Sequence, residues 1–357
     1  MEQALQQWLV GLGVPLGVYS WGKMLLVAAV VAFGFISLTA LWLIYLERKV
    51  SGHIQDRLGP MRAGPKGLIQ TVYDALKLLM KEDIIPRQAD RLLFTLAPIA
   101  ILAISVVVFV TMPFGRNLIP ADLNLGIVFM VAFSSLTVLA IVIAGWSSNN
   151  KWSLLGGLRG GAQMLSYEIP MGLAVVTVVM ATGSFKISDI IAAQADHWNI
   201  WRYPVMGLIA FLVYLTAAVA EVNRGPFDIP EAESELVAGF HTEYTGMKFA
   251  LFFVSEYANT FIVCAIAATL FLGGWNLPFA GLMAERWPTL RPLLESVPLS
   301  VLLFFVKTYA LILLVMWVRW TYPRLRVDQL MGFGWKFLIP VGFANLMLMG
   351  IAMVLTH

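Results

Sequence analysis

Long uninterrupted stretches of apolar residues alternate with short polar segments along this chain of 357 residues. Eight of these stretches have about the 20 residues that a helix needs to cross a hydrocarbon layer about 30 Å thick. They cover residues 22–46, 92–114, 124–147, 162–183, 203–221, 249–274, 297–318 and 335–356. Strands that cross membranes alternate polar and apolar residues over about ten positions, and these runs do not alternate. The pattern predicts an all-α, polytopic integral membrane protein with about eight transmembrane helices in one membrane domain, residues 1–357.

One polar connection is long enough to hold a helix of its own. Between the first two spans, residues 66–81 have helical periodicity, with Leu68 and Val72 on an apolar face and Asp74 and Lys77 on a polar face. We therefore expect an amphipathic interfacial helix in the first cytoplasmic loop. Two arrangements are open: a surface helix that touches only lipid, or a helix that packs on the bundle and walls off a cavity.

Composition narrows the possible chemistry. The chain is 59% hydrophobic and 13% charged, and the charged share is about half that of soluble domains. The net charge of +3 does not indicate a nucleic-acid partner. A single cysteine, Cys264, excludes an internal disulfide and a thiolate-bound iron–sulfur cluster. No removable signal peptide is expected. The glycine-rich run 154–161 is expected to join two transmembrane helices and to let helices approach closely.

The distribution of Lys and Arg predicts the orientation. With the N-terminus outside and eight spans, 17 of these residues fall in inside segments and 6 in outside segments, with Lys307 left inside a span. The bias predicts that both termini lie on the periplasmic side.

Four carboxylates near the inner ends of different spans need an explanation, because an ionisable group inside a membrane is costly. These are Glu47, Glu168, Glu221 and Glu256. One interpretation is that each acid is paired with a base or a tyrosine and holds two helices together. The other, which the number of acids favours, is a hydrated passage that holds and releases protons.

The inner loop 222–248 is unusually acidic for a cytoplasmic segment. Two of its acids fit the first turn of a short helix beginning at Pro230, where they would offset the helix dipole. The others are not explained in this way, and the cluster as a whole is typical of proton uptake or coupling. The acidic side chains are Asp228, Glu231, Glu233, Glu235 and Glu243.

Three blocks of the sequence carry a resemblance to a known family. They are Glu47 to Lys49 with Gln55 to Pro60 and Lys77 to Asp83; Gly145 to Lys151 with Gln163 to Glu168; and Glu221 to Phe240 with Glu243, Tyr244 and Ser255 to Tyr257. Together they resemble the H subunit of respiratory complex I, the bacterial proton-translocating NADH:quinone oxidoreductase. The mitochondrial counterpart in this family is NADH dehydrogenase subunit one.

The resemblance implies a role and partners. It implies a membrane subunit that forms much of a quinone-access chamber and couples quinone reduction to proton translocation, with no redox centre or complete active site of its own. Quinone would be the substrate, and FMN and iron–sulfur clusters would lie in partner subunits. The partners would be hydrophilic quinone-site and iron–sulfur subunits on the cytoplasmic side, together with small and antiporter-like membrane subunits. The location would be the bacterial inner membrane.

The resemblance also assigns residues. The quinone chamber would involve Glu47, Arg48, Asp56, Arg57 and Arg62. The proton relay would involve Glu168, Glu221, Asp228, Glu231, Glu233, Glu235, Glu243 and Glu256. Alternative interpretations are the equivalent subunit of a membrane-bound hydrogenase-type complex, an independent proton-coupled transporter, and a structural anchor, which the buried acids argue against.

Overall fold

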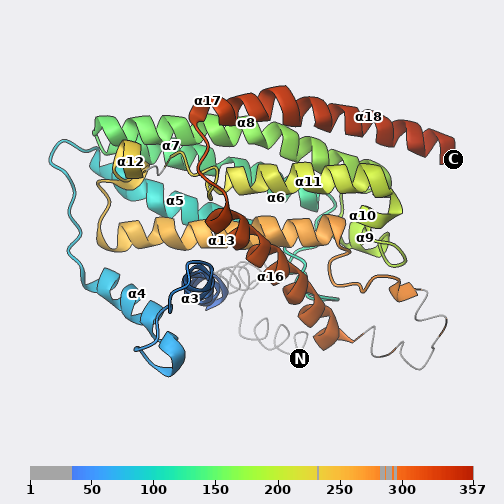
Figure 1. Ribbon diagram of the computed structural model, residues 1–357, viewed down its shortest axis with the longest axis horizontal. Helices are drawn as coiled ribbons and strands as arrows, with labels where there is room; N and C mark the ends of the chain where they lie inside the picture. The colour runs from blue at the N-terminus through green and yellow to red at the C-terminus, as the bar shows by residue number, and fades with distance from the viewer. Residues whose placement is uncertain (1–33, 231–232, 282–285, 287–291, 293–295, 357) are drawn as a thin grey trace, which may run out of the picture.

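The computed structural model describes residues 34–230, 233–281, 286, 292 and 296–356, and all regular elements within these ranges are helical (Figure 1). The long helices are α3 (Ser37–Ile54), α5 (Arg91–Phe109), α8 (Lys151–Thr182), α11 (Pro204–Glu221), α13 (Gly246–Phe271), α16 (Val297–Thr321) and α18 (Ile339–Thr356). The shorter ones are η2 (Pro65–Gly67), α4 (Gln70–Met80), α6 (Gly126–Ser135), α7 (Thr137–Ser147), α9 (Ile187–Ala192), α10 (Asn199–Arg202), α12 (Glu233–Leu236), η3 (Gly239–His241), α17 (Val327–Phe333) and η5 (Gly334–Leu338).

Seven helical stretches in the described part of the chain are long and apolar enough to cross a membrane. Two of the seven are composite. Helix α6 continues into α7 after the single residue Leu136, and α17 continues through the π-helical turn η5 into α18. Residues 22–33 of the expected first span lie outside the described residues. The polytopic all-α prediction is confirmed, while the count of eight stays a prediction.

Two helices extend well beyond the spans predicted from hydropathy. Helix α3 continues to Ile54, past the expected end of the first span at residue 46, and α8 begins at Lys151 rather than at residue 162. A helix does not have to end where the hydrocarbon layer ends, so polar inner ends can remain helical. These extensions carry Glu47, Arg48 and Arg159 on rigid elements.

The glycine-rich run lies inside α8, so the expectation that it forms a connection between helices was wrong. The reason is close packing. A Cβ atom on Gly157 would lie 3.3 Å from the Cα atom of Gly145 in α7, and one on Gly156 would lie 2.8 Å from the Cα atom of Gly239 in η3. The glycines therefore let α7 and the turn η3 contact the backbone of α8, which is the close approach expected of them.

Helix α13 is the centre of the bundle and α18 lies at its edge. The most apolar part of α13 is 61% buried, whereas that of the α17–α18 stretch is 22% buried. Helix α13 packs against α5, α16 and α11, and α8 packs against α11, α7 and α18. Helix α16 crosses the other helices at a steep angle (Figure 1).

The amphipathic segment is helical over Gln70–Met80, shorter than the expected 66–81, and follows the short turn η2. Helix α4 stands beside α3 at one end of the molecule (Figure 1). Asp74 of α4 pairs with Arg48 of α3, while Leu79 and Met80 are exposed. This arrangement fits the second alternative, a helix that packs on the bundle on one side.

Lys307, which the sequence analysis left inside a span, caps the C-terminal end of α13. Its ammonium group donates hydrogen bonds to the carbonyl oxygens of Leu272 at 2.6 Å and Gly274 at 2.8 Å, and it lies 4.4 Å from the ring centre of Trp198. A cation beyond the last turn satisfies free carbonyl groups and offsets the helix dipole.

Candidate functional site

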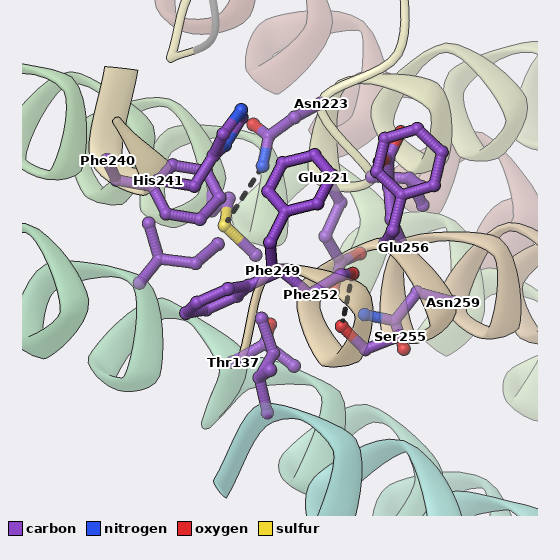
Figure 2. Close-up of a pocket in the computed structure, with 15 residues that line it drawn as sticks. Thr137, Glu221, Asn223, Phe240, His241, Phe249, Phe252, Ser255, Glu256 and Asn259 are labelled. Atoms are coloured by element: carbon purple, nitrogen blue, oxygen red, sulfur yellow. Dashed lines mark hydrogen bonds between the residues drawn. The ribbon is translucent and has the colours of Figure 1, made fainter. Parts of the chain in front are cut away.

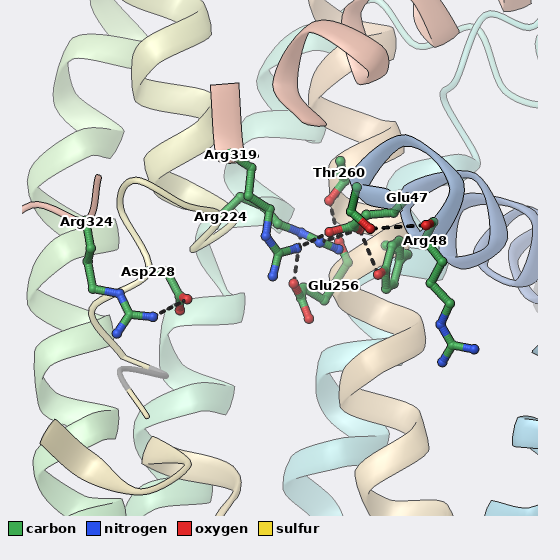
Figure 3. Close-up of polar contacts among 10 residues, drawn as sticks. Glu47, Arg48, Arg224, Asp228, Glu256, Thr260, Arg319 and Arg324 are labelled. Atoms are coloured by element: carbon green, nitrogen blue, oxygen red, sulfur yellow. Dashed lines mark hydrogen bonds and ion pairs between the residues drawn. The ribbon is translucent and has the colours of Figure 1, made fainter. Parts of the chain in front are cut away.

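A buried carboxylate, Glu47 of α3, joins four parts of the chain. Its side chain accepts hydrogen bonds from Arg224 Nη1 and from the Tyr257 hydroxyl, each at 2.8 Å, and also from Arg319 (Figure 3). Glu47 is only 5% exposed. Arg224 follows α11, Tyr257 lies on α13 and Arg319 lies on α16. A buried charge is tolerated only when it is paired and hydrogen-bonded, and this one has three partners.

Arg224 is shared between two acids. Its Nε atom lies 2.9 Å from Glu256 Oε1 of α13, while its Nη1 atom binds Glu47. The ring of Tyr257 lies 4.2 Å from the guanidinium carbon. Burial alone would lower the pKa of Arg224, but the carboxylates of Glu256 and Glu47 outweigh it and hold this pKa above its ordinary value. Arg224 therefore stays charged and links α3 to α13.

A further acid–base pair lies beside Glu47 and Glu256. Asp228 in the loop after α11 binds Arg324 Nη2 at 3.0 Å. Burial raises the pKa of Asp228 above its ordinary value although Arg324 and Arg319 oppose the shift. We call the six side chains the inner ion cluster: Glu47, Asp228, Glu256, Arg224, Arg319 and Arg324 (Figure 3). With three carboxylates and three guanidinium groups, the cluster is neutral when every member is ionised.

Two further acids lie at the break between α6 and α7. Glu168 of α8 accepts a hydrogen bond from the Ser135 hydroxyl, and the carboxyl group of Glu221, the last residue of α11, lies near the Ser134 hydroxyl. Glu221 is buried, and its Oε2 atom has no hydrogen-bond partner among the described residues. The structure therefore brings Glu168 and Glu221 to neighbouring hydroxyl groups.

A small cavity of mixed lining lies between Glu221 and Glu256, and we call it the polar cavity because carboxyl, amide and hydroxyl groups face it. Its volume is about 40 Å³, and its lining includes Asn223, His241 and Ser255 (Figure 2). A polar cavity needs about 10–15 Å³ of such volume to hold one water molecule. Water can therefore fit between the acid of the inner ion cluster and the acid at the α6–α7 break. Burial lowers the pKa of His241 to about 4.

A larger, mainly apolar cavity lies between α3, α4 and α13. Its volume is about 350 Å³, and its walls include Leu41 and Ile44 of α3 and Leu78 of α4. The polar side chains of Arg48 and Asp74 also line it. This shape fits an apolar ligand that has one polar end.

Two aromatic side chains line both cavities. Phe249 and Phe253 of α13 border the polar cavity on one side and the apolar cavity on the other. Their ring centres lie 5.5 Å apart. The two cavities therefore share a wall one side chain thick.

Comparison with known proteins gives the family. Residues 27–350 match the family model described as NADH dehydrogenase. The H subunit of the NADH-quinone oxidoreductase of Carboxydothermus hydrogenoformans is 47% identical over 99% of this chain and 96% of its own length. The H subunit of the Phocaeicola vulgatus enzyme is 48% identical over 88% of this chain and 87% of its own. The chain numbered 8 in the Rhodothermus marinus enzyme is 47% identical over 92% and 97%.

The chain belongs to the family of NADH-quinone oxidoreductase H subunits. The resemblance read from the three sequence blocks is thereby confirmed. The chain is a membrane subunit of an oxidoreductase complex, its partners include other subunits of complex I, and it resides in a bacterial membrane. Within the described ranges, no three His, Cys, Asp or Glu side chains are placed to hold a metal ion.

Several residues that the family resemblance assigned to the site lie away from the two cavities. Asp56, Arg57 and Arg62 are exposed in the connection between α3 and η2. Glu235 is exposed and pairs with Arg159 at 2.7 Å.

The other acids of the inner loop are peripheral or undescribed. Glu243 accepts a hydrogen bond from Asn150 Nδ2 at 2.6 Å. Glu231 lies outside the described residues, and for Glu233 only the backbone is described, at the start of α12. Of the eight predicted relay acids, the structure gathers Asp228 and Glu256 in the inner ion cluster and Glu168 and Glu221 at the α6–α7 break.

Sequence reasoning did not single out some residues that the structure places at the site. Arg319 was counted only toward the orientation, although its position at the inner end of a span was a usable signal. Ser134 and Ser135 gave no signal, because serine is ordinary in apolar helices and satisfies itself on its own backbone. Phe249 and Phe253 also gave none, since aromatic residues in a span are usually core.

Proposed function

We propose that the chain forms the membrane part of a quinone-access chamber and transfers the effect of quinone reduction to protons held on buried carboxylates. The observation that carries the proposal is the wall of Phe249 and Phe253, which brings an apolar cavity and an acid-lined polar cavity within one side chain of each other. An electron acceptor in one cavity could then act on acids in the other.

The apolar cavity suits a quinone. Its lining is mainly aliphatic, which matches an isoprenoid tail, and Arg48 and Asp74 offer hydrogen bonds to a polar headgroup. The cavity is bordered by α4, whose exposed Leu76, Leu79 and Met80 fit contact with lipid. A quinone dissolved in the bilayer could reach the chamber along this helix, while FMN and iron–sulfur clusters in hydrophilic partner subunits supply the electrons.

The inner ion cluster suits the coupling step. Reduction of a quinone to a quinol takes up two electrons and two protons, so charge appears transiently near the chamber. Electrostatic effects are strong where water is scarce. A change of charge on a quinone in the apolar cavity would act across Phe249 and Phe253. It would alter whether Glu256 and Glu221 carry protons. Protons would then move through Glu168 toward the small and antiporter-like membrane subunits of an enzyme in the bacterial inner membrane.

The quinone part is tested by narrowing the apolar cavity. Ala250 of α13 lines it, and Ala250→Phe should raise KM for a long-tailed quinone several-fold while a short-tailed analogue is affected less. The matched control is Ala192→Phe on α9, where the side chain is exposed. Equal KM values for the long-tailed quinone in Ala250→Phe and in the unaltered complex would contradict the chamber.

The coupling part is tested by removing acids without changing their shape. Glu256→Gln and Glu168→Gln complexes should assemble and lose most quinone-linked proton pumping in membrane vesicles. Asp328→Asn is the control, since the Asp328 side chain is 74% exposed. Full pumping in both acid variants would refute the relay.

A further inference from the structure

The connection between α6 and α7 is a local break that carries hydroxyl groups. The amide of Leu136 donates to the Phe133 carbonyl at 3.1 Å, a three-residue step tighter than an α-helix. The Thr137 hydroxyl donates to the Ser134 carbonyl at 2.6 Å. The break presents the hydroxyl groups of Ser134 and Ser135 to the neighbouring helices α8 and α11.

Each of these two serines contacts a different acid. The Ser135 hydroxyl donates to Glu168 Oε1, and the Ser134 hydroxyl lies close enough to the Glu221 carboxyl group to interact with it. Both hydroxyl oxygens also lie 2.9 Å from the Val131 carbonyl oxygen. They are therefore no more than twice that distance apart, and one water molecule can bridge two oxygens that lie about 4.5 Å apart with hydrogen bonds of about 2.8 Å.

We infer that Ser134 and Ser135 form a hydroxyl bridge that carries protons between Glu221 and Glu168. The inference rests on the proposed function and adds the positioning residues of its relay. A proton leaves the Glu221 carboxyl group, each hydroxyl accepts one proton on its oxygen and releases its own to the next acceptor, and the Glu168 carboxylate takes up the last. One proton is moved, only O–H bonds form and break, and both serines end unchanged.

The hydroxyl bridge has Glu221 at the end that faces the polar cavity and Glu168 at the end that faces the side of the subunit. Glu221 lines the polar cavity, and its Oε2 atom, which has no partner in the described part of the chain, is available to a proton from that side (Figure 2). Glu168 is partly exposed on α8 between exposed Leu165 and Ile169. Protons that reach Glu168 therefore arrive at the lateral flank of the subunit, where an adjoining membrane subunit would cover an otherwise costly carboxylate.

The hydrogen bonds exceed what the helix needs. A serine inside a helix ordinarily bonds the carbonyl one turn earlier and requires nothing else, and both serines make such a bond to Val131. Each hydroxyl has a single hydrogen, so donation to Val131 and donation to an acid are alternatives for it. The contacts with Glu168 and Glu221 therefore offer these hydroxyl groups partners beyond the one that the helix supplies.

The test compares serine and acid variants of the assembled complex in membrane vesicles. The double variant Ser134→Ala/Ser135→Ala removes both hydroxyl groups, and Ser134→Thr/Ser135→Thr keeps them. Thr177→Val is the control for loss of a buried hydroxyl, because the Thr177 hydroxyl bonds the Leu173 carbonyl of its own helix. Glu168→Gln and Glu221→Gln serve as references for a broken relay. Assembly is measured as the amount of complex in the membrane.

We expect pumping by the alanine pair to fall about tenfold or more, since a positioned proton-transfer group commonly contributes about 10²–10⁴-fold. The threonine pair and Thr177→Val should keep most pumping. Full pumping in the alanine pair while both glutamine variants fail would reject the bridge and leave the proposed relay standing. Full pumping in both glutamine variants would reject the proposed relay itself. A threonine pair as inactive as the alanine pair would also reject the bridge.

A second measurement tests the contact between Ser135 and Glu168 if the double variant assembles poorly. In Ser135→Ala alone, the infrared carboxyl stretch assigned to Glu168 by its absence in Glu168→Gln should shift, because that carboxyl group loses a hydrogen bond. An unshifted band would overturn the contact on which the bridge depends.

Discussion

At the scale of single residues, charge balance decides which side chains can be buried. Glu47 and Arg224 are both almost completely buried, yet each has an oppositely charged partner within hydrogen-bonding distance. Removing one member of a buried pair costs more than the pair contributes, because the other charge is left without a partner. Surface pairs such as Arg326 with Asp328, whose atoms lie 3.8 Å apart, follow a different rule, since water solvates both groups.

This difference gives a prediction for Glu47→Gln. The variant leaves Arg224 and Arg319 with one fewer counter-charge, so the subunit should lose about 3–5 kcal/mol of stability. Thermal denaturation of the purified complex and the amount of subunit in the membrane measure the loss. Asp328→Asn should change the stability by about 1 kcal/mol or less. Equal stabilities of the two variants would contradict the structural role of the inner ion cluster.

A second residue-scale prediction concerns pH. Burial lowers the pKa of His241 to about 4, against an ordinary value of 6.5. Between these values the unfolded chain binds a proton that the folded chain does not, so this residue reduces stability as the pH falls through that window. His241→Asn should lose less thermal stability than the unaltered complex between pH 7 and pH 5. His53→Asn, at an exposed position, is the control, and an identical drop in all three would contradict the prediction.

At the scale of elements, the glycines of α8 determine how closely its neighbours pack. A side chain at Gly156 would meet the backbone of Gly239, whereas a Cβ atom at Gly172, further along the same helix, would have nothing within 4 Å. The same residue type therefore has opposite roles within one helix. The first position permits contact with η3, and the second only lowers helix propensity.

Substitution at these two glycines should separate the roles. Gly156→Ala should destabilise the complex by about 1–3 kcal/mol, because overpacking forces α8 and η3 apart. Gly172→Ala should be neutral or stabilise by about 0.5–1 kcal/mol, the usual gain of alanine over glycine in a helix. Thermal inactivation of quinone reductase activity measures both, and a Gly156→Ala complex as stable as Gly172→Ala would show that the contact is not tight.

The same scale explains how much could be predicted from sequence. Acids inside apolar runs are visible locally, so Glu47, Glu168, Glu221 and Glu256 could be recognised. Their partners could not, because Glu47 binds residues 177, 210 and 272 positions away along the chain. The predicted start of α8 was wrong because polar residues were interpreted as the end of the helix. The amphipathic pattern located α4 to within a few residues.

At the scale of the whole molecule, α4 extends the bundle sideways beyond α3 at one end (Figure 1). Its outer side is apolar at Leu76 and Leu79 and charged at Lys77, and all three side chains are exposed. An amphipathic helix with this distribution lies in the plane of the membrane interface. The outer surface of α4 would then contact lipid directly beside the apolar cavity.

Spin labels can test this position in the assembled complex. Leu76→Cys and Lys77→Cys are adjacent, and the chain has a single native cysteine, Cys264, which is buried. A label at position 76 should be relaxed mainly by oxygen, which concentrates in lipid, and a label at position 77 mainly by a water-soluble nickel complex. Equal responses at both positions would place α4 away from the interface.

The sharing of Arg224 has a mechanical consequence. One guanidinium group binds a carboxylate of α3 and a carboxylate of α13 at the same time. When Glu256 is neutralised by a proton, its attraction for the guanidinium group largely disappears, and Arg224 keeps the carboxylate of Glu47 and the ring of Tyr257. The strength of the attraction between α3 and α13 therefore depends on whether Glu256 carries a proton. A chemical event at a single oxygen atom is thus converted into a difference in how firmly the subunit's central helix is tethered to its neighbour.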